Sequence, residues 1–383
     1  MNNIHICSGS YDRAITGFVF DIANTIEDDI ALESTPEMTR RYATVAHTGP
    51  IRCVASHNNI LASSGDDEII RVYDVMKMVE LGSLMLQQAS ISHIEFGSGK
   101  MMSAADDGSI CIWLVKDWSC DGQIKAHKGK ITGLSVHPSG RLALSVGQDR
   151  VMALWDLSTY KSLFTIKTKT NTTLVRWSQD GAYYALVCDK EVRVFNSDGG
   201  LVSVLPHPAR VLSIVFHKVD MIATGCDDGV IRTWTVEGEC GRLVHELVQD
   251  VRRVSCLALV PSPPDRVLIA SGSSDGQVSI WDLSTTPSPT RIATADAKLR
   301  ITSICSINPD HHPTKSVQKP KRESRAKVAA EPSTQLARNH TKPPAAAKKQ
   351  TAPIISTRPT AQIKKKLRER RKSLMKKTSL KKN

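Results

Sequence analysis

The sequence predicts an all-β protein built from seven repeated units, followed by a basic C-terminal tail without a core of its own. Two observations lead to this prediction: one pattern of residues recurs along the first 307 positions, and charge and aromatic content change abruptly after Ile307. Sequence repeats with a period of 20–50 residues determine the architecture of the whole domain. Seven aspartates serve as anchors of the pattern, at spacings of 55, 40, 42, 40, 39 and 47 residues: Asp12, Asp67, Asp107, Asp149, Asp189, Asp228 and Asp275.

Fixed positions around each anchor carry the same kind of residue. Four residues before it stands a small, mostly hydroxylated side chain: Ser8, Ser63, Ser103, Ser145, Ala185, Thr224 and Ser271. Six residues after it stands an aromatic one: Phe18, Tyr73, Trp113, Trp155, Phe195, Trp234 and Trp281. Only 5% of the chain is aromatic, so chance does not produce a column that is aromatic in every unit.

Each unit has the signals of a β-hairpin. Turns such as Asp107-Gly108 and Asp228-Gly229 lie between runs that alternate apolar and polar residues, a strong hairpin signal. A histidine 20 to 22 residues before three of the anchors completes a set that could form a buried hydrogen-bonded chain within one sheet. This structural network is predicted to comprise His47, Ser63, Asp67, Tyr73, His127, Ser145, Asp149, Trp155, His207, Thr224, Asp228, Trp234, Asp275 and Trp281.

Other units depart from the pattern. The histidine is missing before Asp107, Asp189 and Asp275, where residues such as Gln87 and Gln249 occupy the region. The complete network is therefore expected in three units, which begin with His47, His127 and His207.

The repeats resemble the WD40 family over about residues 3–307. Trp-Asp dipeptides stand at Trp155-Asp156 and Trp281-Asp282, with Tyr73-Asp74 as a close variant. The resemblance implies a seven-bladed β-propeller of four-stranded antiparallel blades. The first anchor comes too early for residues before it to supply a complete blade. Residues 299–307 are therefore expected to pair with the N-terminal strands and close the ring over 1–307, which removes exposed sheet edges.

A longer stretch, from Ala126 to Asp149, is similar to the p21-activated kinase-interacting WD-repeat proteins, a subfamily of nucleolar factors. Within it, His137-Pro-Ser-Gly140 and the run from Leu142 to Gly147 are not required by a propeller. The resemblance implies a nuclear and nucleolar role in assembling the large (60S) ribosomal subunit. Its partners would be pre-60S particle proteins, and the chain would act as a monomer within that large complex. A second implied role is to bind and inhibit a p21-activated kinase.

The segment 308–383 is predicted to be disordered. It holds 22 Lys and Arg against four carboxylates, a formal charge of +18, whereas residues 1–307 carry −5, and it contains no Phe, Trp or Tyr. Such a composition buries too little apolar surface to offset chain entropy. A short helix is possible near residues 361–375.

The densest basic cluster of the tail is a candidate nuclear-targeting and rRNA-binding segment: Lys364, Lys365, Lys366, Arg368, Arg370, Arg371, Lys372, Lys376 and Lys377. Without aromatic residues to stack on bases, contact with pre-rRNA would depend on phosphates and have low sequence specificity. A merely solubilising charge run is the alternative. Ser373 follows Arg-Arg-Lys and is a candidate for phosphorylation, which would weaken phosphate binding. In the folded part, Lys125, Lys128, Lys130 and Arg150 are expected on loops or blade edges, available to a partner.

Catalytic, metal and cofactor sites are not expected. The recurring Ser, His and Asp residues suggest a hydrolase triad, but three copies in register are better explained as structural bonds. Paired carboxylates such as Asp66-Asp67 are explained by the anchor and its turn, and no nucleotide-binding glycine motif occurs. The nine cysteines form no CxxC pair, so reduced thiols are expected. No apolar run is long enough to span a membrane. A ubiquitin-ligase substrate receptor is a less favoured alternative, because both Trp-Asp pairs are followed by Leu-Ser rather than by an arginine at the second position.

Overall fold

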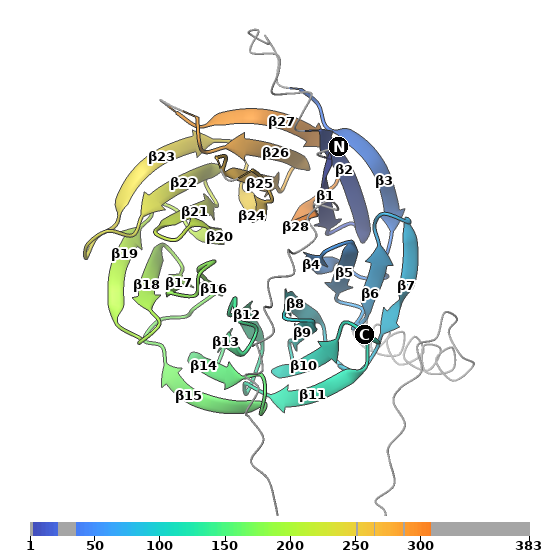
Figure 1. Ribbon diagram of the computed structural model, residues 1–383, viewed down its shortest axis with the longest axis vertical. Helices are drawn as coiled ribbons and strands as arrows, with labels where there is room; N and C mark the ends of the chain where they lie inside the picture. Colours follow the sequence, from blue (N-terminus) through green and yellow to red (C-terminus); the bar gives the residue numbers. More distant parts are fainter. Residues whose placement is uncertain (1–2, 22–35, 250–251, 264, 286–287, 308–383) are drawn as a thin grey trace, which may run out of the picture.

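Seven four-stranded antiparallel sheets form a closed ring (Figure 1), which confirms the predicted all-β, seven-bladed propeller. This computed structural model describes residues 3–21, 36–249, 252–263, 265–285 and 288–307. The predicted tail, 308–383, and the possible helix near 361–375 lie outside these residues. No helix in the described ranges is long and apolar enough to cross a membrane.

The blades are numbered here in chain order, each from its innermost to its outermost strand. Blade 1 contains β28 (Ile301–Ile307), β1 (Asn3–Ser10), β2 (Ala14–Asp21) and β3 (Thr39–Val45). Blade 2 contains β4 (Ile51–His57), β5 (Ile60–Gly65), β6 (Ile70–Asp74) and β7 (Val79–Leu84). Blade 3 contains β8 (Ile91–Gly97), β9 (Lys100–Ala105), β10 (Ser109–Leu114) and β11 (Cys120–Lys125). Blade 4 contains β12 (Ile131–Val136), β13 (Leu142–Gly147), β14 (Val151–Asp156) and β15 (Lys161–Lys167).

Blades 5 to 7 repeat the same order. Blade 5 contains β16 (Leu174–Trp177), β17 (Tyr183–Cys188), β18 (Glu191–Asn196) and β19 (Leu201–Pro206). Blade 6 contains β20 (Val211–Lys218), β21 (Met221–Cys226), β22 (Val230–Thr235) and β23 (Arg242–Val248). Blade 7 contains β24 (Val254–Val260), β25 (Leu268–Ser273), β26 (Gln277–Asp282) and β27 (Thr290–Asp296).

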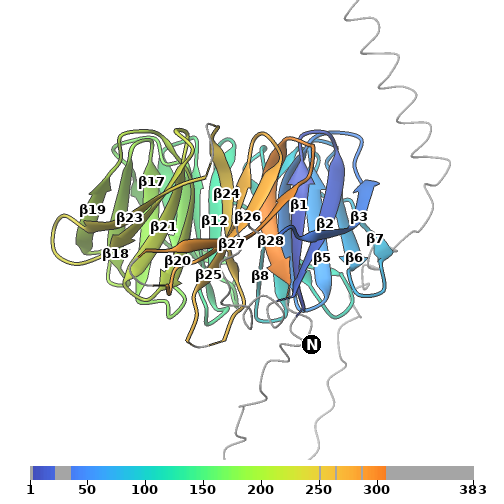
Figure 2. The same cartoon turned by 90° about the horizontal axis from the view of Figure 1, so that it is seen from above.

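Antiparallel order divides the connections between two faces of the ring, seen edge-on in Figure 2. The turns between the second and third strands of a blade lie on the same face as the loops that lead to the next blade. All seven anchor aspartates stand in the turns between the second and third strands, so we call this side of the propeller the anchor face. The remaining hairpin turns form the opposite face.

The Asp-Gly turns require glycine for a steric reason. Gly108 has a φ of +84°, and a Cβ there would lie 2.2 Å from the carbonyl oxygen of His127. A side chain in this position would be strained by its backbone angle and would also clash with the next loop. The aspartate before it accepts a hydrogen bond from the backbone N–H of Ser109, 2.9 Å away, which fixes the turn.

The ring is closed by strands from the two ends of the propeller sequence. The last strand, β28, pairs with β1 in the register His5↔Ile307, Cys7↔Cys305 and Ser10↔Ile301. Blade 1 is thus completed by residues nearly three hundred positions away from its other strands. Because β28 is an innermost strand that starts on the anchor face, the described chain ends at Ile307 on the opposite face.

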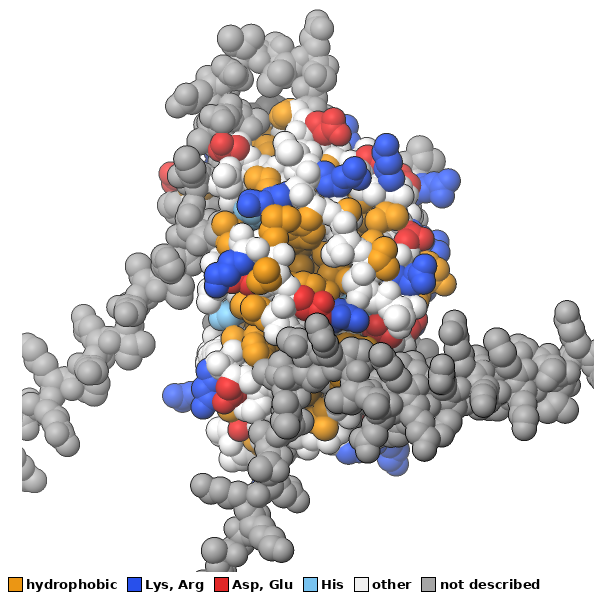
Figure 3. Space-filling view, turned by 90° about the vertical axis from the view of Figure 1, so that its right-hand side faces the viewer, with side chains coloured by type: hydrophobic (Ala, Val, Ile, Leu, Met, Phe, Trp, Pro, Cys, Tyr) orange, Lys and Arg blue, Asp and Glu red, His pale blue; other side chains and the backbone are white. Residues whose placement is uncertain are grey.

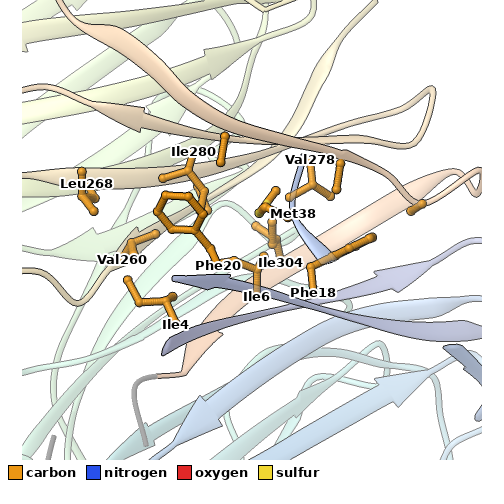
Figure 4. Close-up of a cluster of buried hydrophobic side chains, with 14 of the residues drawn as sticks. Ile4, Ile6, Phe18, Phe20, Met38, Val260, Leu268, Val278, Ile280 and Ile304 are labelled. Atoms are coloured by element: carbon orange, nitrogen blue, oxygen red, sulfur yellow. The ribbon is translucent and has the colours of Figure 1, made fainter. Parts of the chain in front are cut away.

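Apolar side chains fill the spaces between neighbouring blades. The largest cluster joins blades 7 and 1, and Figure 4 shows Phe18, Phe20 and Ile4 facing Val260, Leu268 and Ile280 across that space. Phe18 is only 1% exposed. The aromatic column of the repeat therefore contributes to packing between blades as well as to hydrogen bonds within them.

Candidate interaction site

Blade 4 holds a continuous chain of three side-chain hydrogen bonds that connects β13 and β14 to the β11–β12 loop. The indole Nε1 of Trp155 donates to Ser145 Oγ at 2.8 Å, and that hydroxyl donates to His127 Nε2 at 2.7 Å. At the other nitrogen of the imidazole, His127 Nδ1 donates to the Asp149 carboxylate at 3.0 Å. Asp149 also accepts the backbone N–H groups of Lys128 and Val151. These hydrogen bonds attach the β11–β12 loop on the anchor face to the middle of the blade 4 sheet.

Blade 2 repeats this arrangement. His47 Nδ1 lies 2.9 Å from Asp67 Oδ1, and its Nε2 accepts from Ser63 Oγ at 2.7 Å. Tyr73 takes the sequence position in blade 2 that Trp155 has in blade 4, and burial raises the pKa of Tyr73 to about 12 although Ser63 opposes this shift. The two blades therefore bring together eight of the network residues expected from the sequence.

The anchor carboxylates of blades 2 and 4, Asp67 and Asp149, are stabilised in their charged form. Burial by itself would raise the pKa of Asp67, but bonds from His47 and from the backbone of Thr48 outweigh it and hold the pKa below its ordinary value. The pKa of Asp149 is lowered in the same way, by the backbone of Lys128 and by His127. Each anchor thus remains an acceptor for loop N–H groups at neutral pH.

Blade 6 differs from the expected network. His207 Nδ1 donates to the carbonyl of Leu205 at 3.0 Å rather than to Asp228, although its Nε2 lies 2.9 Å from Thr224 Oγ1. Asp228 instead forms an ion pair with Arg232, 2.8 Å away. The expected His207–Asp228 contact was wrong because a cation four residues after the anchor competes for its carboxylate.

In the same blade, the buried Nε1 of Trp234 has no hydrogen-bond partner among the described residues. Its indole instead contacts the His207 ring, with centroids 4.9 Å apart.

Blade 3 completes a network without histidine. The side-chain oxygen of Gln87 accepts from Ser103 Oγ at 2.6 Å, its amide nitrogen donates to Ser109, and Trp113 Nε1 donates to Ser103. The repeat pattern did not predict this role for Gln87, although Gln87 precedes Asp107 by the same 20 residues that separate His47 from Asp67.

In blade 7 the chain of bonds is shorter. Trp281 Nε1 donates to Ser271 Oγ at 3.0 Å, and Asp275 accepts from the backbone of Gln277. The buried side-chain amide of Gln249 has no partner among the described residues.

The geometry of blades 2 and 4 has the residue types of a catalytic triad but not its accessibility. Ser145 is fully buried, and its oxygen is already engaged by Trp155 and His127. A nucleophile needs a path for substrate and a free lone pair. The Ser-His-Asp sets therefore act in this geometry as structural hydrogen-bond chains.

The buried histidines predict a pH dependence of stability. Burial lowers the pKa of His207 to about 4, and of His93 and His217 likewise to about 4. An unfolded histidine protonates near 6.5, so the unfolded state binds more protons between these values. The contribution of these histidines to the free energy of unfolding should be at its maximum above pH 6.5. It should decrease as the pH falls from 6.5 toward 4, which urea denaturation at a series of pH values measures.

The variant His207→Gln tests this directly, because Gln87 shows that glutamine can occupy the corresponding position in blade 3. It should fold, and its stability should decline less steeply than that of the wild type between pH 6.5 and 4. An unchanged slope would contradict the assignment to His207.

The innermost strands of all seven blades line a central channel of about 570 Å³. Glu95 lies in it and forms an ion pair with Arg176 at 3.0 Å, while Ser135 Oγ donates to the same carboxylate. Burial raises the pKa of Glu95 in spite of Arg176. In the described ranges, no group of three or more His, Cys, Asp or Glu side chains could hold a metal ion.

The outer side of blades 1 and 2 carries apolar side chains in solvent. Figure 3 shows hydrophobic groups gathered on this side, between separate charged ones. A groove of about 290 Å³ runs between the blades and is lined by residues that include Tyr42, Tyr73 and Met78. Neighbouring exposed residues on and beside β7 are Met76, Val79, Leu81, Met85 and Leu86. Exposed apolar patches of this kind are typical of protein-interaction surfaces.

The basic residues expected in the tail, from Lys364 to Lys377, lie outside the described residues. The basic residues expected on loops of the propeller are among the described residues. Lys125, Lys128, Lys130 and Arg150 all lie on the anchor face, at the end of β11, in the β11–β12 loop and in the β13–β14 turn.

Comparisons with known proteins agree with this fold. The family model "WD domain, G-beta repeat" matches residues 39–74, 118–156, 199–235 and 241–282. A Danio rerio protein named p21-activated protein kinase-interacting protein 1-like is 32% identical over 308 residues, which cover 79% of this chain and 80% of that protein. The chain belongs to the WD40-repeat family of p21-activated protein kinase-interacting proteins. This confirms the resemblance seen in the sequence.

Another similar protein, from Saccharomyces cerevisiae, is named Protein MAK11. It is 28% identical over 331 residues, covering 74% of this chain and 79% of that protein. A chain in the crystal structure of a mitotic checkpoint complex has the same fold, with a TM-score of 0.59 and 19% identity, over 72% of this chain and 86% of that chain. WD40 propellers are a family of protein-interaction scaffolds, which agrees with the accessible surfaces described above.

Proposed function

We propose that this chain is a non-enzymatic assembly factor for the large (60S) ribosomal subunit, acting in the nucleus and concentrated in the nucleolus. The propeller docks pre-60S proteins, and the basic tail binds pre-rRNA. The observation that carries the proposal is the division of charge, −5 over residues 1–307 and +18 over 308–383, in a member of the p21-activated protein kinase-interacting family.

The propeller suits a docking platform because its loops are fixed. The buried chains of bonds in blades 2, 3 and 4 attach loops to the middle of their sheets, so a partner would meet preorganised surfaces. Pairing of β28 with β1 completes blade 1 and leaves no gap in the ring. A rigid scaffold with functional loops is a common arrangement for binding.

The tail suits an electrostatic contact with RNA. Its cations would neutralise phosphates and release counterions, so binding would weaken steeply with salt. The absence of aromatic residues predicts little discrimination among base sequences.

Affinity purification of the full-length chain at low and moderate salt tests the proposal. The wild type should recover precursor large-subunit rRNA together with assembly proteins. Replacing the nine cluster residues between Lys364 and Lys377 by glutamine should abolish salt-labile rRNA recovery. A matched variant neutralises nine tail cations outside the cluster: Lys315, Lys319, Lys321, Arg322, Arg325, Lys327, Arg338, Lys342 and Lys348. An equal loss of rRNA in both variants would show that binding depends on the total charge of the tail rather than on the cluster. If the wild-type protein recovers no precursor rRNA, the proposal is contradicted.

The names of the relatives favour one second candidate, a signalling adaptor that binds and inhibits a p21-activated kinase. The exposed apolar groove between blades 1 and 2 would be available to such a protein partner. The two functions separate in one experiment: inhibition of a purified p21-activated kinase by the full-length chain, in the absence of RNA. A kinase that remains fully active would leave the ribosomal role as the only candidate.

A further inference from the structure

Cations are concentrated on one part of the anchor face, over blades 4 and 5. They stand at the ends of outer strands, in the loops that follow them and in the turns after β13 and β17. Five of them are solvent-exposed side chains that we call the basic arc: Lys128, Arg150, Lys167, Lys169 and Lys190. They come from four successive connections on the anchor face, β11–β12, β13–β14, β15–β16 and β17–β18, so the ring arranges them in a row rather than in a pocket.

The carboxylates in this part of the face are already engaged by other groups. Asp106 forms an ion pair with Lys130 at 3.0 Å, and Asp149 holds His127. Asp107 is bonded by Ser109 and approached by Lys125, while Asp189 lies 3.8 Å from Arg210. Among the described residues, no carboxylate lies within 4.0 Å of a basic-arc cation. The arc therefore has an excess of positive charge that the protein does not neutralise.

The rest of the anchor face has the opposite balance. In the described turns and loops of blades 6, 7, 1 and 2, carboxylates outnumber cations. The seven carboxylates are Asp12, Asp66, Asp67, Glu68, Asp227, Asp228 and Asp275, and the six cations are Arg13, Arg210, Arg252, Arg253, Lys298 and Arg300. The excess of the basic arc is thus local, and it occurs in a segment of the chain whose net charge is negative.

We propose that the basic arc binds the phosphate backbone of an RNA segment, as a second contact besides the tail. Four of its five cations are lysines, which act as point charges suited to phosphates. Apart from the buried His127, its connections contain no aromatic side chain, so they offer no stacking platform for bases. The inference rests on the proposed function insofar as the RNA is pre-rRNA.

The described chain ends at Ile307 on the opposite face, whereas the arc lies on the anchor face. A propeller held between the two contacts would have a defined orientation, which a tail alone does not provide.

Charge reversal in the full-length protein tests the inference. The variant K128E/K169E/K190E changes three exposed arc lysines. The matched control, K116E/K161E/K218E, changes three equally exposed lysines on the opposite face and gives the same net charge. With a labelled RNA hairpin as probe, each lost phosphate contact lowers the slope of log affinity against log salt by about 0.7–0.9. The arc variant should therefore show a slope smaller in magnitude by about two and roughly a hundredfold weaker binding in 0.1 M salt, while the control keeps the wild-type slope.

Lysine acetylation footprinting gives a readout that the tail does not affect. The RNA hairpin should protect Lys128, Lys169 and Lys190 from acetylation and leave Lys116, Lys161 and Lys218 reactive. Equal loss of affinity in the two triple variants, or RNA binding without protection of the arc, would overturn the inference while leaving the tail-based function intact. If polyglutamate protects the arc lysines from acetylation and the RNA hairpin does not, the inference is overturned, and an acidic protein becomes the expected partner. Failure to recover pre-rRNA in the purification would instead contradict the proposed function, because the hairpin assay does not depend on it.

Discussion

Replacing Phe18 by alanine is expected to lower the free energy of unfolding by about 3–5 kcal/mol. Phe18 is 1% exposed and belongs to the cluster between blades 7 and 1, where the two ends of the propeller sequence meet. Truncation removes its buried apolar surface and leaves a cavity that the rigid strands around it cannot refill. Guanidinium denaturation followed by tryptophan fluorescence measures the change.

Phe164→Ala is the matched control, because it makes the same chemical change on the exposed outer strand β15. Phe164 is 40% exposed, so its truncation should change stability by less than about 1 kcal/mol. Similar losses in the two variants would show that the seam between blades 7 and 1 is not the packed region that the structure describes.

Ser145→Ala is expected to cost about 2–4 kcal/mol, because it removes the centre of the blade 4 network. The change leaves both Trp155 Nε1 and His127 Nε2 without their partner in a buried site. A buried polar group that loses its hydrogen bond costs about 1–3 kcal/mol. Denaturation midpoints and the near-ultraviolet signal of the tryptophans report the loss.

Ser203→Ala provides a control of the same type in blade 5. Ser203 is also fully buried in a strand, but its hydroxyl has no hydrogen-bond partner among the described residues. Its removal should be neutral or stabilising. A destabilisation by Ser203→Ala as large as that of Ser145→Ala would mean that the loss reflects packing rather than the hydrogen-bond network.

The fold could be predicted because the repeat marks the same three-dimensional position many times. In blades 3, 4 and 7 the tryptophan six positions after the anchor donates to the serine four positions before it, as Trp155 does to Ser145 and Trp281 to Ser271. That relation is local in sequence and depends only on one hairpin. The role of Gln87 does not follow from the histidine pattern, because a glutamine amide replaces the imidazole as both donor and acceptor at the same spacing.

Other features depend on which side chains compete in space, and the sequence did not reveal them. Asp228 has the spacing of an anchor, yet Arg232 takes its carboxylate, since a residue four positions later in the same hairpin lies on the same side of the sheet. Lys128 and Arg150 could be placed on loops individually. That they form one row with Lys167, Lys169 and Lys190 follows only from the closed ring.

The pairing of β28 with β1 also determines the order in which the protein can form. Synthesis releases β1 first and β28 last among the strands, so β1 has an unpaired edge until nearly all of the propeller has been made. Unpaired strand edges promote wrong association, and contacts between distant residues slow folding. We expect the nascent chain to need protection during this interval. A circular permutant that begins at Lys298, with the original ends of the propeller joined, should escape this requirement, because each blade then consists of consecutive strands.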